Sequence, residues 1–576
     1  MKLNLPPKDN KAILNLPVNK TRLTSLTLPP KKQNNPTSEV INNNNVTKLA
    51  ENEIIVYDNH GNPKTIILNS NQLEFKKYLE NLVSCCLIGA AGTGKTTCTN
   101  AGIQALLNTG KVPTINMHHK YIPDNSPGII VTAYTRRAVQ NIKRQLSGDI
   151  SKNCITIHKL LEYSPVIYEC VNEETGKTYN KRLFEPRRNS LNPLSENIKV
   201  ILIDEASMLS VDLWNKLLDA LPNPNNVTFI FIGDINQLPP TFGRAILGYK
   251  LNELPVIELT EVYRQALESP IIKFAHRILS GSPIFPHQLK DYNEPGKLQI
   301  IPYPKKYKAE HALLEAVKMF KHAYDNGTYN PEEHTILIPQ VNYKGNEKYS
   351  FAASLFNKYI ASHIAKVNSR EVYEIIAGFN TFYYSVGDYV IYDKQDAIIV
   401  SIEKNQTYIG KPYQEHSLTL DYFGYDSSGE NNTTNNTDFD IDKLLSMSIE
   451  SENEGEKLEC SHSIVIQLID SDNQLTVDTV GGIKSIDLAY SGTVHKAQGS
   501  EWLKVFLLIH NSHNVMVNRE LLYTAVTRAR EQLIIVCEQD TFNRGINLQA
   551  IKGNSLVEKA EFFKGKELNE NKVVIT

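Results

Sequence analysis

The most constraining feature of this chain is the glycine-rich segment GAAGTGKT, which matches G-x-x-x-x-G-K-[ST]. It directly follows the apolar run SCCLI and precedes a helical stretch. In that setting glycines let backbone N–H groups face a phosphate chain, Lys95 adds a positive charge, and Thr96 offers a hydroxyl to Mg²⁺. The alternative, a merely flexible loop, does not explain the preceding strand. The predicted phosphate-binding residues are Gly89, Ala90, Ala91, Gly92, Thr93, Gly94, Lys95, Thr96 and Thr97.

The pattern around this loop is typical of a parallel sheet covered by helices. Short apolar runs alternate with helical stretches, and each run ends in glycine or polar residues. Ligands of open α/β sheets collect beyond the carboxyl ends of the strands, so these endings are expected to meet at one crevice. The runs are SCCLIG, GIIVTAYT, KVILIDEAS and NVTFIFIGD.

Length and composition predict several domains in a reducing compartment. A chain of 576 residues exceeds one ordinary core, and 41% hydrophobic with 22% charged residues is typical of a globular protein without a membrane span. Seven cysteines without a C-x-x-C pair favour free thiols. The net charge of -2 means that any nucleic-acid binding must use a local basic groove. We expect a cytoplasmic location, or the host cytoplasm for a viral protein.

The domain organisation follows from changes of pattern along the chain. A second α/β pattern begins near residue 250, is interrupted by a β-rich stretch, and resumes at IKSIDLAYSG. Residues 1–50 form a basic tail, which could add weak affinity for DNA or serve as a linker or partner-binding segment. The predicted divisions are a disordered basic tail at 1–50, a first α/β domain at 51–248 with a hairpin insertion at 163–195, a second at 249–379 and 481–545, a β-rich insertion at 380–480, and a C-terminal tail at 546–576.

A second group of candidate residues lies at the end of the run VILIDEAS. Asp204 is expected to hold Mg²⁺, and Glu205 is expected to polarise an attacking water. Two solvated carboxylates at a helix start are the alternative. The four apolar residues before them favour the end of a buried strand, beside the phosphate loop.

A series of short segments between about residue 66 and residue 537 resembles, in its order, the motifs of the RecD/Dda branch of the superfamily-one DNA helicases. The resemblance implies two RecA-like P-loop NTPase domains, with ATP and Mg²⁺ in the cleft between them, an inserted β-hairpin and a β-rich, barrel-like insertion. The segments that carry it are LNSNQ, TAYTRRA, TIHKLL, GDINQLPP, VYRQ, AYSGTVHKAQGSEW and LLYTAVTRAR.

The resemblance assigns further residues to the nucleotide. Gln72 is the implied contact of the base, and Gln237 is the implied link between the terminal phosphate and the strand. Arg264 and Arg528 are expected to reach the cleft from the second domain, where such an arginine can raise the rate by roughly 10³ to 10⁵. Arg528 is the expected finger, and a surface ion pair is the alternative for either arginine. Gly499 and Glu501 complete the nucleotide set.

The resemblance also implies residues that contact a single strand through hydroxyl groups and rings. For each histidine, a hydrogen-bonding core or surface role is equally open, and Tyr134 departs from the usual small residue or proline. The hairpin resembles a separation pin, whose Tyr163, Tyr168, Tyr179 and Phe184 could stack at a fork or pack its base. The expected strand contacts are Thr132, Tyr134, Thr156, His158, Thr493 and His495.

The activity that the resemblance implies is ATP-dependent movement along single-stranded DNA, 5′ to 3′, with unwinding of duplex DNA. The process would be DNA replication, recombination or repair. The expected partners are forked DNA and replication or recombination proteins. The protein is expected to be a monomer that does not bind a membrane. Two alternatives stay open. One is an RNA helicase, because the contacts are largely to the backbone. The other is a nucleotide-switched binding or remodelling protein that does not unwind duplexes.

Overall fold

The computed structural model describes most of the chain beyond residue 51. The expected N-terminal tail, Arg264 and the tip of the hairpin lie outside the described residues. Among those that are described, no helix is long and apolar enough to cross a membrane. The described residues are 52–565 without 58–62, 145, 147–148, 172–177, 240–243, 263–267, 304–307, 332, 341–350, 379, 393–394, 406–459, 470–473 and 554.

The first sheet has six parallel strands in the order β10-β3-β9-β8-β4-β5. Its strands form because they are short, almost continuously apolar runs that are buried on both faces. The four runs expected as strands are confirmed as β3, β4, β8 and β9. The bounds are β3 (Cys85–Gly89), β4 (Ile129–Ala133), β5 (Cys154–Thr156), β8 (Val200–Asp204), β9 (Thr228–Gly233) and β10 (Val256–Leu259).

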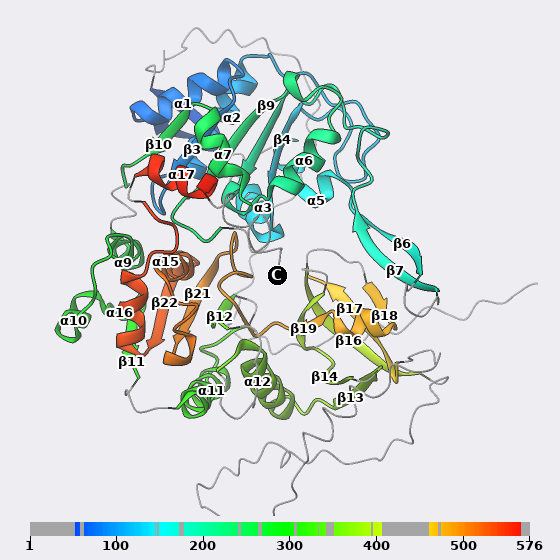
Figure 1. The fold of residues 1–576 in the computed structure, drawn as a ribbon, viewed down its shortest axis with the longest axis vertical. Coiled ribbons are helices and arrows are strands. Elements are labelled where there is room, and N and C mark those ends of the chain that lie inside the picture. The colour runs from blue at the N-terminus through cyan, green and yellow to red at the C-terminus, as the bar shows by residue number, and fades with distance from the viewer. Residues whose placement is uncertain are drawn as a thin grey trace, which may run out of the picture. The chain divides into compact units, whose positions relative to one another are not determined.

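Helices cover both faces of this sheet (Figure 1). One face packs on Phe75 and Ile103, and the other packs on Trp214 and Leu247. A small antiparallel pair, β1 (Glu53–Tyr57) and β2 (Pro63–Ile67), lies before the first helix. The helices are α1 (Ser70–Glu80), α2 (Lys95–Asn108), α3 (Arg136–Lys143), α4 (Asp149–Lys152), α5 (Ile157–Leu160), α6 (Val211–Asp219) and α7 (Ile246–Glu253), with 3₁₀ turns η1 (Ala206–Met208) and η2 (Pro224–Asn226).

The first domain extends beyond the boundary expected at residue 248. After α7 the chain returns as β10, which pairs in parallel with β3 from Val256 opposite Cys86 to Leu259 opposite Gly89. Within the segment PVIEL only the four residues of β10 form a strand, and buried and less buried residues alternate along it. So short a pattern does not by itself predict a strand of a sheet. The edge beside the phosphate loop is therefore closed by a strand from the expected second domain.

The hairpin expected within 163–195 is present. Strands β6 (Ser164–Val171) and β7 (Thr178–Glu185) pair antiparallel, from Ser164 opposite Glu185 to Val171 opposite Thr178. It projects from the helices and strands of the first domain (Figure 1). The side chains of Tyr168, Tyr179 and Phe184 lie outside the described residues, so their expected roles stay predictions.

The second sheet is also parallel, with the strand order β11-β22-β21-β12-β20. Its two faces pack on separate apolar clusters, one around Phe274 and Leu521 and one around Phe320 and Phe356. Two parallel-sheet domains confirm the predicted α/β fold. The elements are β11 (Leu298–Pro302), β12 (His334–Leu337), β20 (Ser491–Gly492), β21 (Trp502–Ile509), β22 (Ala529–Cys537), α9 (Pro270–Leu279), α10 (Leu289–Tyr292), α11 (Ala309–Asp325), α12 (Ala353–Val367), α15 (Arg519–Val526) and α16 (Gln539–Asn547), with η3 (Pro286–Gln288) and η6 (Asn511–His513).

The β-rich insertion is an antiparallel module, here called the β module, spanning 372–488. It begins before the expected residue 380 and ends after 480, because its outer strands share one core with the rest, including Ile375 and Ile486. The described strands form two separate sheets, so a closed barrel is not confirmed. They are β13 (Val372–Ala377), β14 (Asn380–Ser385), β15 (Tyr389–Tyr392), β16 (Gln395–Lys404), β17 (His462–Leu468), β18 (Gln474–Val477) and β19 (Ile486–Leu488), with helix α14 (Val480–Lys484) before β19.

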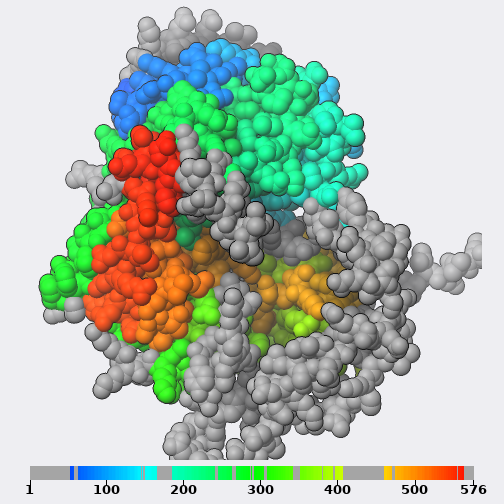
Figure 2. Space-filling view, viewed as in Figure 1, coloured from blue at the N-terminus to red at the C-terminus, as the bar shows by residue number. Residues whose placement is uncertain are grey.

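The C-terminal segment returns to the first domain instead of forming a simple tail from residue 546. Helix α17 (Leu556–Gly565) contacts α7, and Ala560 is buried in the first domain's core. Figure 2 shows this segment in red against the green surface of the first domain. Lys559, also buried, donates to Asn236 Oδ1. The segment therefore ties the second domain to the loop after β9.

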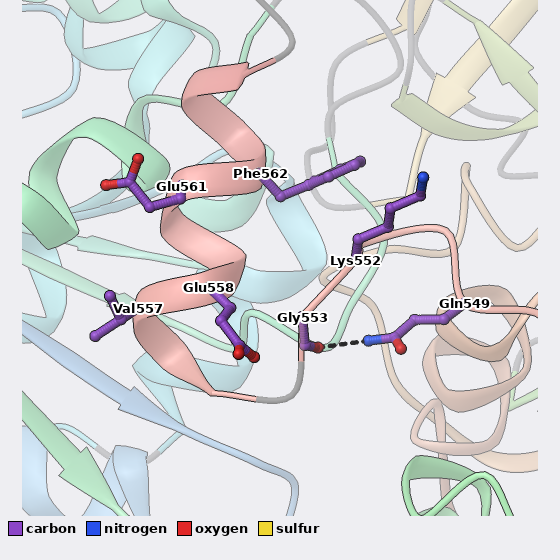
Figure 3. Close-up of a pocket in the computed structure, with 7 residues that line it drawn as sticks. All are labelled: Gln549, Lys552, Gly553, Val557, Glu558, Glu561 and Phe562. Atoms are coloured by element: carbon purple, nitrogen blue, oxygen red, sulfur yellow. Dashed lines mark hydrogen bonds between the residues drawn. The ribbon is translucent and has the colours of Figure 1, made fainter.

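A shallow surface pocket lies where the chain enters α17 (Figure 3). Gln549 Nε2 donates to Gly553 O over 2.7 Å, and this bond holds the entry segment. Lys552 and Phe562 also line the pocket. None of the residues predicted for the nucleotide or the strand lies among its lining residues, so this pocket is not the predicted site.

Candidate functional site

The phosphate loop joins β3 to α2 by a tight turn. Gly92 and Gly94 both have φ of 82°, the left-handed region that glycine adopts without steric cost. A Cβ on Gly89 would lie 2.4 Å from Thr93 Oγ1, so a side chain there would displace the loop. Helix α2 begins at Lys95, so its first N–H groups are available at the concave side of the loop. This geometry suits an anionic ligand.

Lys95 folds back over its own loop. Its ammonium donates to Gly89 O over 2.6 Å and to Ala90 O over 3.1 Å. Thr93 Oγ1 also donates to Ala90 O, over 2.9 Å. Both lysine partners are neutral carbonyls, so the positive charge of Lys95 is available to compensate a bound phosphate.

Asp204 and Glu205 lie at the carboxyl end of β8, in the same sheet. Glu205 N–H donates to Asp204 Oδ1 over 2.9 Å. Burial, followed by the neighbouring Glu205 carboxylate, raises the pKa of Asp204, while Lys95 lowers it. The charge of Lys95 therefore acts on the Asp204 carboxyl group.

Glu205 has an unusual backbone conformation for a residue with a side chain. Its φ of 50° and ψ of 43° are left-handed, which costs about 1 kcal/mol in a residue other than glycine. The turn carries the chain from β8 directly into η1 and leaves the Glu205 side chain only half-buried. Strain of this kind persists where the surrounding structure holds a side chain in place, and here it directs Glu205 toward the second domain.

Arg528 reaches the acidic pair from the second domain. It follows α15, is 3% exposed, and lies 3.8 Å from Glu205 Oε1 through its NH1 atom. Its Nε donates to Thr524 O over 3.0 Å and its NH1 donates to Ser500 O over 3.2 Å. The guanidinium is therefore fixed by its own domain and presented to the first domain. Arg528 is thus in contact with Glu205, and the neighbouring Asp204 feels the charge of Lys95, although these residues are far apart in the chain.

The loop after β9 carries Gln237, which is also buried between the domains. The neighbouring Leu238 N–H donates to Thr524 Oγ1 over 3.1 Å, and Leu238 O accepts from Gln498 Nε2 over 2.6 Å. Among the described residues, none forms a hydrogen bond with Gln237 Oε1. The second domain thus holds this loop, and the role of Gln237 stays a prediction.

Gln72 has a clear structural function. Its backbone N–H donates to Asn69 Oδ1 over 2.9 Å, and its Oε1 accepts from Asn69 N over 3.2 Å. These two bonds form a capping box at the start of α1. The side chain is fully buried, so contact with a nucleotide base, which stays a prediction, would require rearrangement.

The hydroxyl groups expected to touch a strand are largely covered. Thr132, Thr156 and Thr493 are all at most 5% exposed. Thr156 Oγ1 accepts from Lys159 N, and Thr493 Oγ1 accepts from Lys496 N, so both cap turns. Direct strand contacts by these hydroxyls are not available in this conformation, and their roles stay predictions.

The rings expected near the strand pack against one another. His158 lies 5.4 Å from the Tyr134 ring and 5.0 Å from the Tyr163 ring, both in edge-on geometry. Tyr163 also packs on the first domain's core, which favours packing at the base of the hairpin. His495 is half-buried, and burial lowers its pKa.

Arg137 of the first domain contacts both the second domain and the β module. Its guanidinium lies 4.3 Å from the ring centre of Trp502 in the second domain, and its Nε donates to Asp396 Oδ2 of the β module over 3.0 Å. Thr135 Oγ1 donates nearby to Gly499 O over 3.3 Å. Gly499 thus contributes a backbone contact between the domains, while exposed Glu501 raises the pKa of Asp204.

Three residues that form contacts between the two domains were not singled out by the sequence. Asp234 directly follows the buried strand β9, as Asp204 follows β8, and this parallel was the available signal. Tyr523 lies within LLYTAVTRAR, five residues before Arg528, and His276 lies in α9 without a local motif. Tyr523 and His276 both contact Ala91 of the phosphate loop.

Two family models match parts of the two α/β domains separately. The family described as AAA domain matches residues 75–243, and the family described as UvrD-like helicase C-terminal domain matches residues 488–536. The ATP-dependent RecD2 DNA helicase of Deinococcus radiodurans is 25% identical over 450 residues, which cover 77% of this chain and 46% of the relative. The chain thus spans about half the length of that relative.

Further relatives include two proteins of the same group. The RecBCD enzyme subunit RecD of Buchnera aphidicola is 23% identical, over 79% of this chain and 70% of the relative. The ATP-dependent DNA helicase dda of Enterobacteria phage T4 is 31% identical, over 37% and 42%. A Bacteroides Pif1 helicase solved with ADP-AlF3 and ssDNA has a TM-score of 0.41 and 15% identity, over 88% and 99%. By these sequence matches, the chain is similar to the RecD/Dda-like branch of the superfamily-one helicases.

Proposed function

We propose that this chain is an ATP-dependent helicase that moves along single-stranded DNA and separates duplexes. The observation that carries the proposal is that Arg528 of the second domain lies 3.8 Å from Glu205, in the first domain that also carries the phosphate loop with Lys95. A terminal phosphate bound there would touch both domains, so its hydrolysis could drive opening and closing of the cleft. Relatives described as ATP-dependent DNA helicases support DNA as the strand.

The proposed chemistry divides between the two domains. Lys95 compensates the charge of the phosphates, Glu205 orients and deprotonates the attacking water, and Arg528 stabilises charge on the transferred phosphoryl group. Thr96 and Asp204 offer hard oxygen ligands of the kind that Mg²⁺ prefers, so these two residues are proposed to hold it. Mg²⁺ bound there neutralises charge on the phosphate oxygens.

A strand-displacement assay on four substrates tests the proposed function. Duplex DNA and duplex RNA, each with a 5′ or a 3′ overhang, are mixed with the chain and ATP, with ATP hydrolysis measured in parallel. We expect displacement of the DNA duplex with the 5′ overhang, the direction implied by the resemblance of the motifs to the RecD/Dda branch. The Lys95→Ala variant is the control for contaminating activity.

Each alternative has its own signature in that assay. Equal or faster displacement of RNA would favour an RNA helicase, and displacement only from a 3′ overhang would reverse the proposed direction. Strand-stimulated hydrolysis without any displacement would favour a nucleotide-switched remodelling protein. Each result would overturn a separate part of the proposal.

The root of the hairpin supplies a test of its proposed role as a wedge. Glu162 and Arg188, here called the root clamp, flank the two strands and join them through Arg188 Nε and Glu162 Oε2 at 2.9 Å. Arg188 also donates to Pro193 O over 3.2 Å. Burial opposes ionisation of Glu162, but the Lys120 N–H and Arg188 outweigh it and hold its pKa below the usual value. The pair therefore fixes where the hairpin leaves the domain.

Arg188→Ala is expected to reduce strand displacement while DNA-stimulated hydrolysis is retained. Removing one partner of a buried pair typically costs about 3 kcal/mol, here concentrated at the hairpin root. Displacement and hydrolysis rates are measured on the same DNA, together with the thermal midpoint. Arg187→Ala is the matched control, because Arg187 is the exposed neighbour. Undiminished displacement by a destabilised Arg188→Ala protein would exclude a positioning role for the clamp.

A further inference from the structure

One peptide group of the phosphate loop is held on both sides by the second domain. Ala91 N–H donates to the Tyr523 hydroxyl over 2.7 Å. Ala91 O lies 3.2 Å from His276 Nε2, which must donate because a carbonyl oxygen only accepts. The second domain therefore holds the loop through the N–H and the carbonyl oxygen of Ala91.

The Tyr523 hydroxyl also holds a second part of the first domain. It donates to Asp234 Oδ2 over 2.6 Å, while Asp234 Oδ1 accepts from Asn236 N over 2.9 Å. Tyr523 and Asp234 are both fully buried. Burial, followed by Asp234, raises the pKa of Tyr523, so its hydroxyl keeps the proton that it donates. One hydroxyl thus joins the phosphate loop, the loop after β9 and α15.

Opening of the cleft would break these contacts together. The tyrosine belongs to the second domain, whereas Ala91 and Asp234 belong to the first. A buried carboxylate that loses its donor is costly until water reaches it, so partial opening is disfavoured. The hydroxyl therefore favours a closed cleft over intermediate positions.

We propose that Tyr523 is a positioning residue whose hydroxyl couples closure of the second domain to the phosphate loop and to the loop after β9. The proposal rests on the proposed function, because closure matters only if ATP turnover occurs in this cleft. Tyr523 does not contact the reacting atoms in this arrangement. It acts through Ala91, which follows the Ala90 carbonyl that accepts from Lys95, and through Asp234, three residues before Gln237.

The test is Tyr523→Phe, which removes one oxygen and keeps the ring. Loss of the net stabilisation from about one hydrogen bond should lower the ratio of closed to open protein about tenfold. The value of kcat/KM for ATP with saturating single-stranded DNA should fall by the same factor, whichever of kcat and KM changes. Tyr329→Phe is the matched control, because Tyr329 is buried in the second domain and donates to Tyr490 O over 3.0 Å.

Closure itself is measured by energy transfer between dyes on the two domains. Leu191 in the first domain is 95% exposed and Val515 in the second is 93% exposed, so cysteines introduced there are accessible. Native thiols such as Cys85 and Cys537 are buried, and burial raises the pKa of each to about 12, which disfavours labelling. Protein without the introduced cysteines gives the labelling background.

The outcomes separate this inference from the proposed function. Reduced closure with ADP and aluminium fluoride in Tyr523→Phe, but not in Tyr329→Phe, would support the coupling even if no duplex is displaced. Unchanged closure and unchanged kcat/KM in a folded Tyr523→Phe protein would overturn it, even if wild-type protein unwinds DNA. Equal losses in both variants would indicate a general effect of removing a buried hydroxyl, and would also overturn it.

Discussion

Arg528→Ala is expected to lower the kcat of DNA-stimulated ATP hydrolysis by roughly 10³-fold or more, as for other arginines that act across a cleft on a transferred phosphoryl group. Nucleotide binding should be retained, because the phosphate loop belongs to the other domain. The guanidinium is already fixed by Thr524 O and Ser500 O and lies 3.8 Å from Glu205. Steady-state hydrolysis and equilibrium binding of a fluorescent ATP analogue measure the two effects separately.

Arg530→Ala is the control for this prediction. Arg530 lies two residues after Arg528, in β22, and its side chain is exposed. The Arg530→Ala variant therefore removes an arginine side chain that does not face Glu205. Arg528→Lys tests whether charge alone is sufficient, since lysine cannot present the planar fork of donors. If Arg528→Ala lost binding and turnover to the same extent, Arg528 would stabilise bound ATP rather than the transition state.

Lys95→Ala is expected to reduce hydrolysis by at least roughly 10²- to 10³-fold, the range seen when one preorganised charge-stabilising donor is removed. The ammonium lies 2.6 Å from Gly89 O and 3.1 Å from Ala90 O within the phosphate loop, and its charge lowers the pKa of Asp204. No other described lysine forms a hydrogen bond with these carbonyls, so a substitute charge is not at hand. The measurement is ATP turnover with and without single-stranded DNA.

Lys111→Ala provides the comparison for Lys95. Its ammonium also donates to a backbone carbonyl, Glu80 O, over 2.7 Å, but at an exposed site beyond α2. It should leave turnover unchanged. Hydrolysis by Lys95→Ala within tenfold of wild type would remove Lys95 from the mechanism, whereas loss of DNA binding as well would indicate damage beyond the phosphate loop.

Local sequence was sufficient for several parts of the structure. Four apolar runs predicted strands β3, β4, β8 and β9, because continuous burial on both faces of a parallel sheet requires such runs. The glycines of the phosphate loop predicted its turn, and their φ of 82° explains the requirement. The hairpin was also predictable, since β-prone residues flank a turn sequence.

The parts that sequence reasoning missed depend on pairing between distant segments. Strand β10 joins the first sheet and α17 returns to the first domain, although neither segment carries a distinctive local pattern. The β module begins at Val372 because β13 and β14 share a core with strands nearly a hundred residues away. Threonines that match strand-binding motifs proved to be buried, because burial is set by what packs on them.

By itself, the sequence determined the phosphate loop, the acidic pair after β8 and the presence of two α/β domains, since these follow from residue type and spacing within short segments. Only the tertiary structure decided that Arg528 faces Glu205 and that Tyr523 and His276 hold the Ala91 peptide. Contacts of this kind join residues hundreds of positions apart. Their geometry arises from the packing of whole sheets and helices, which no local pattern encodes.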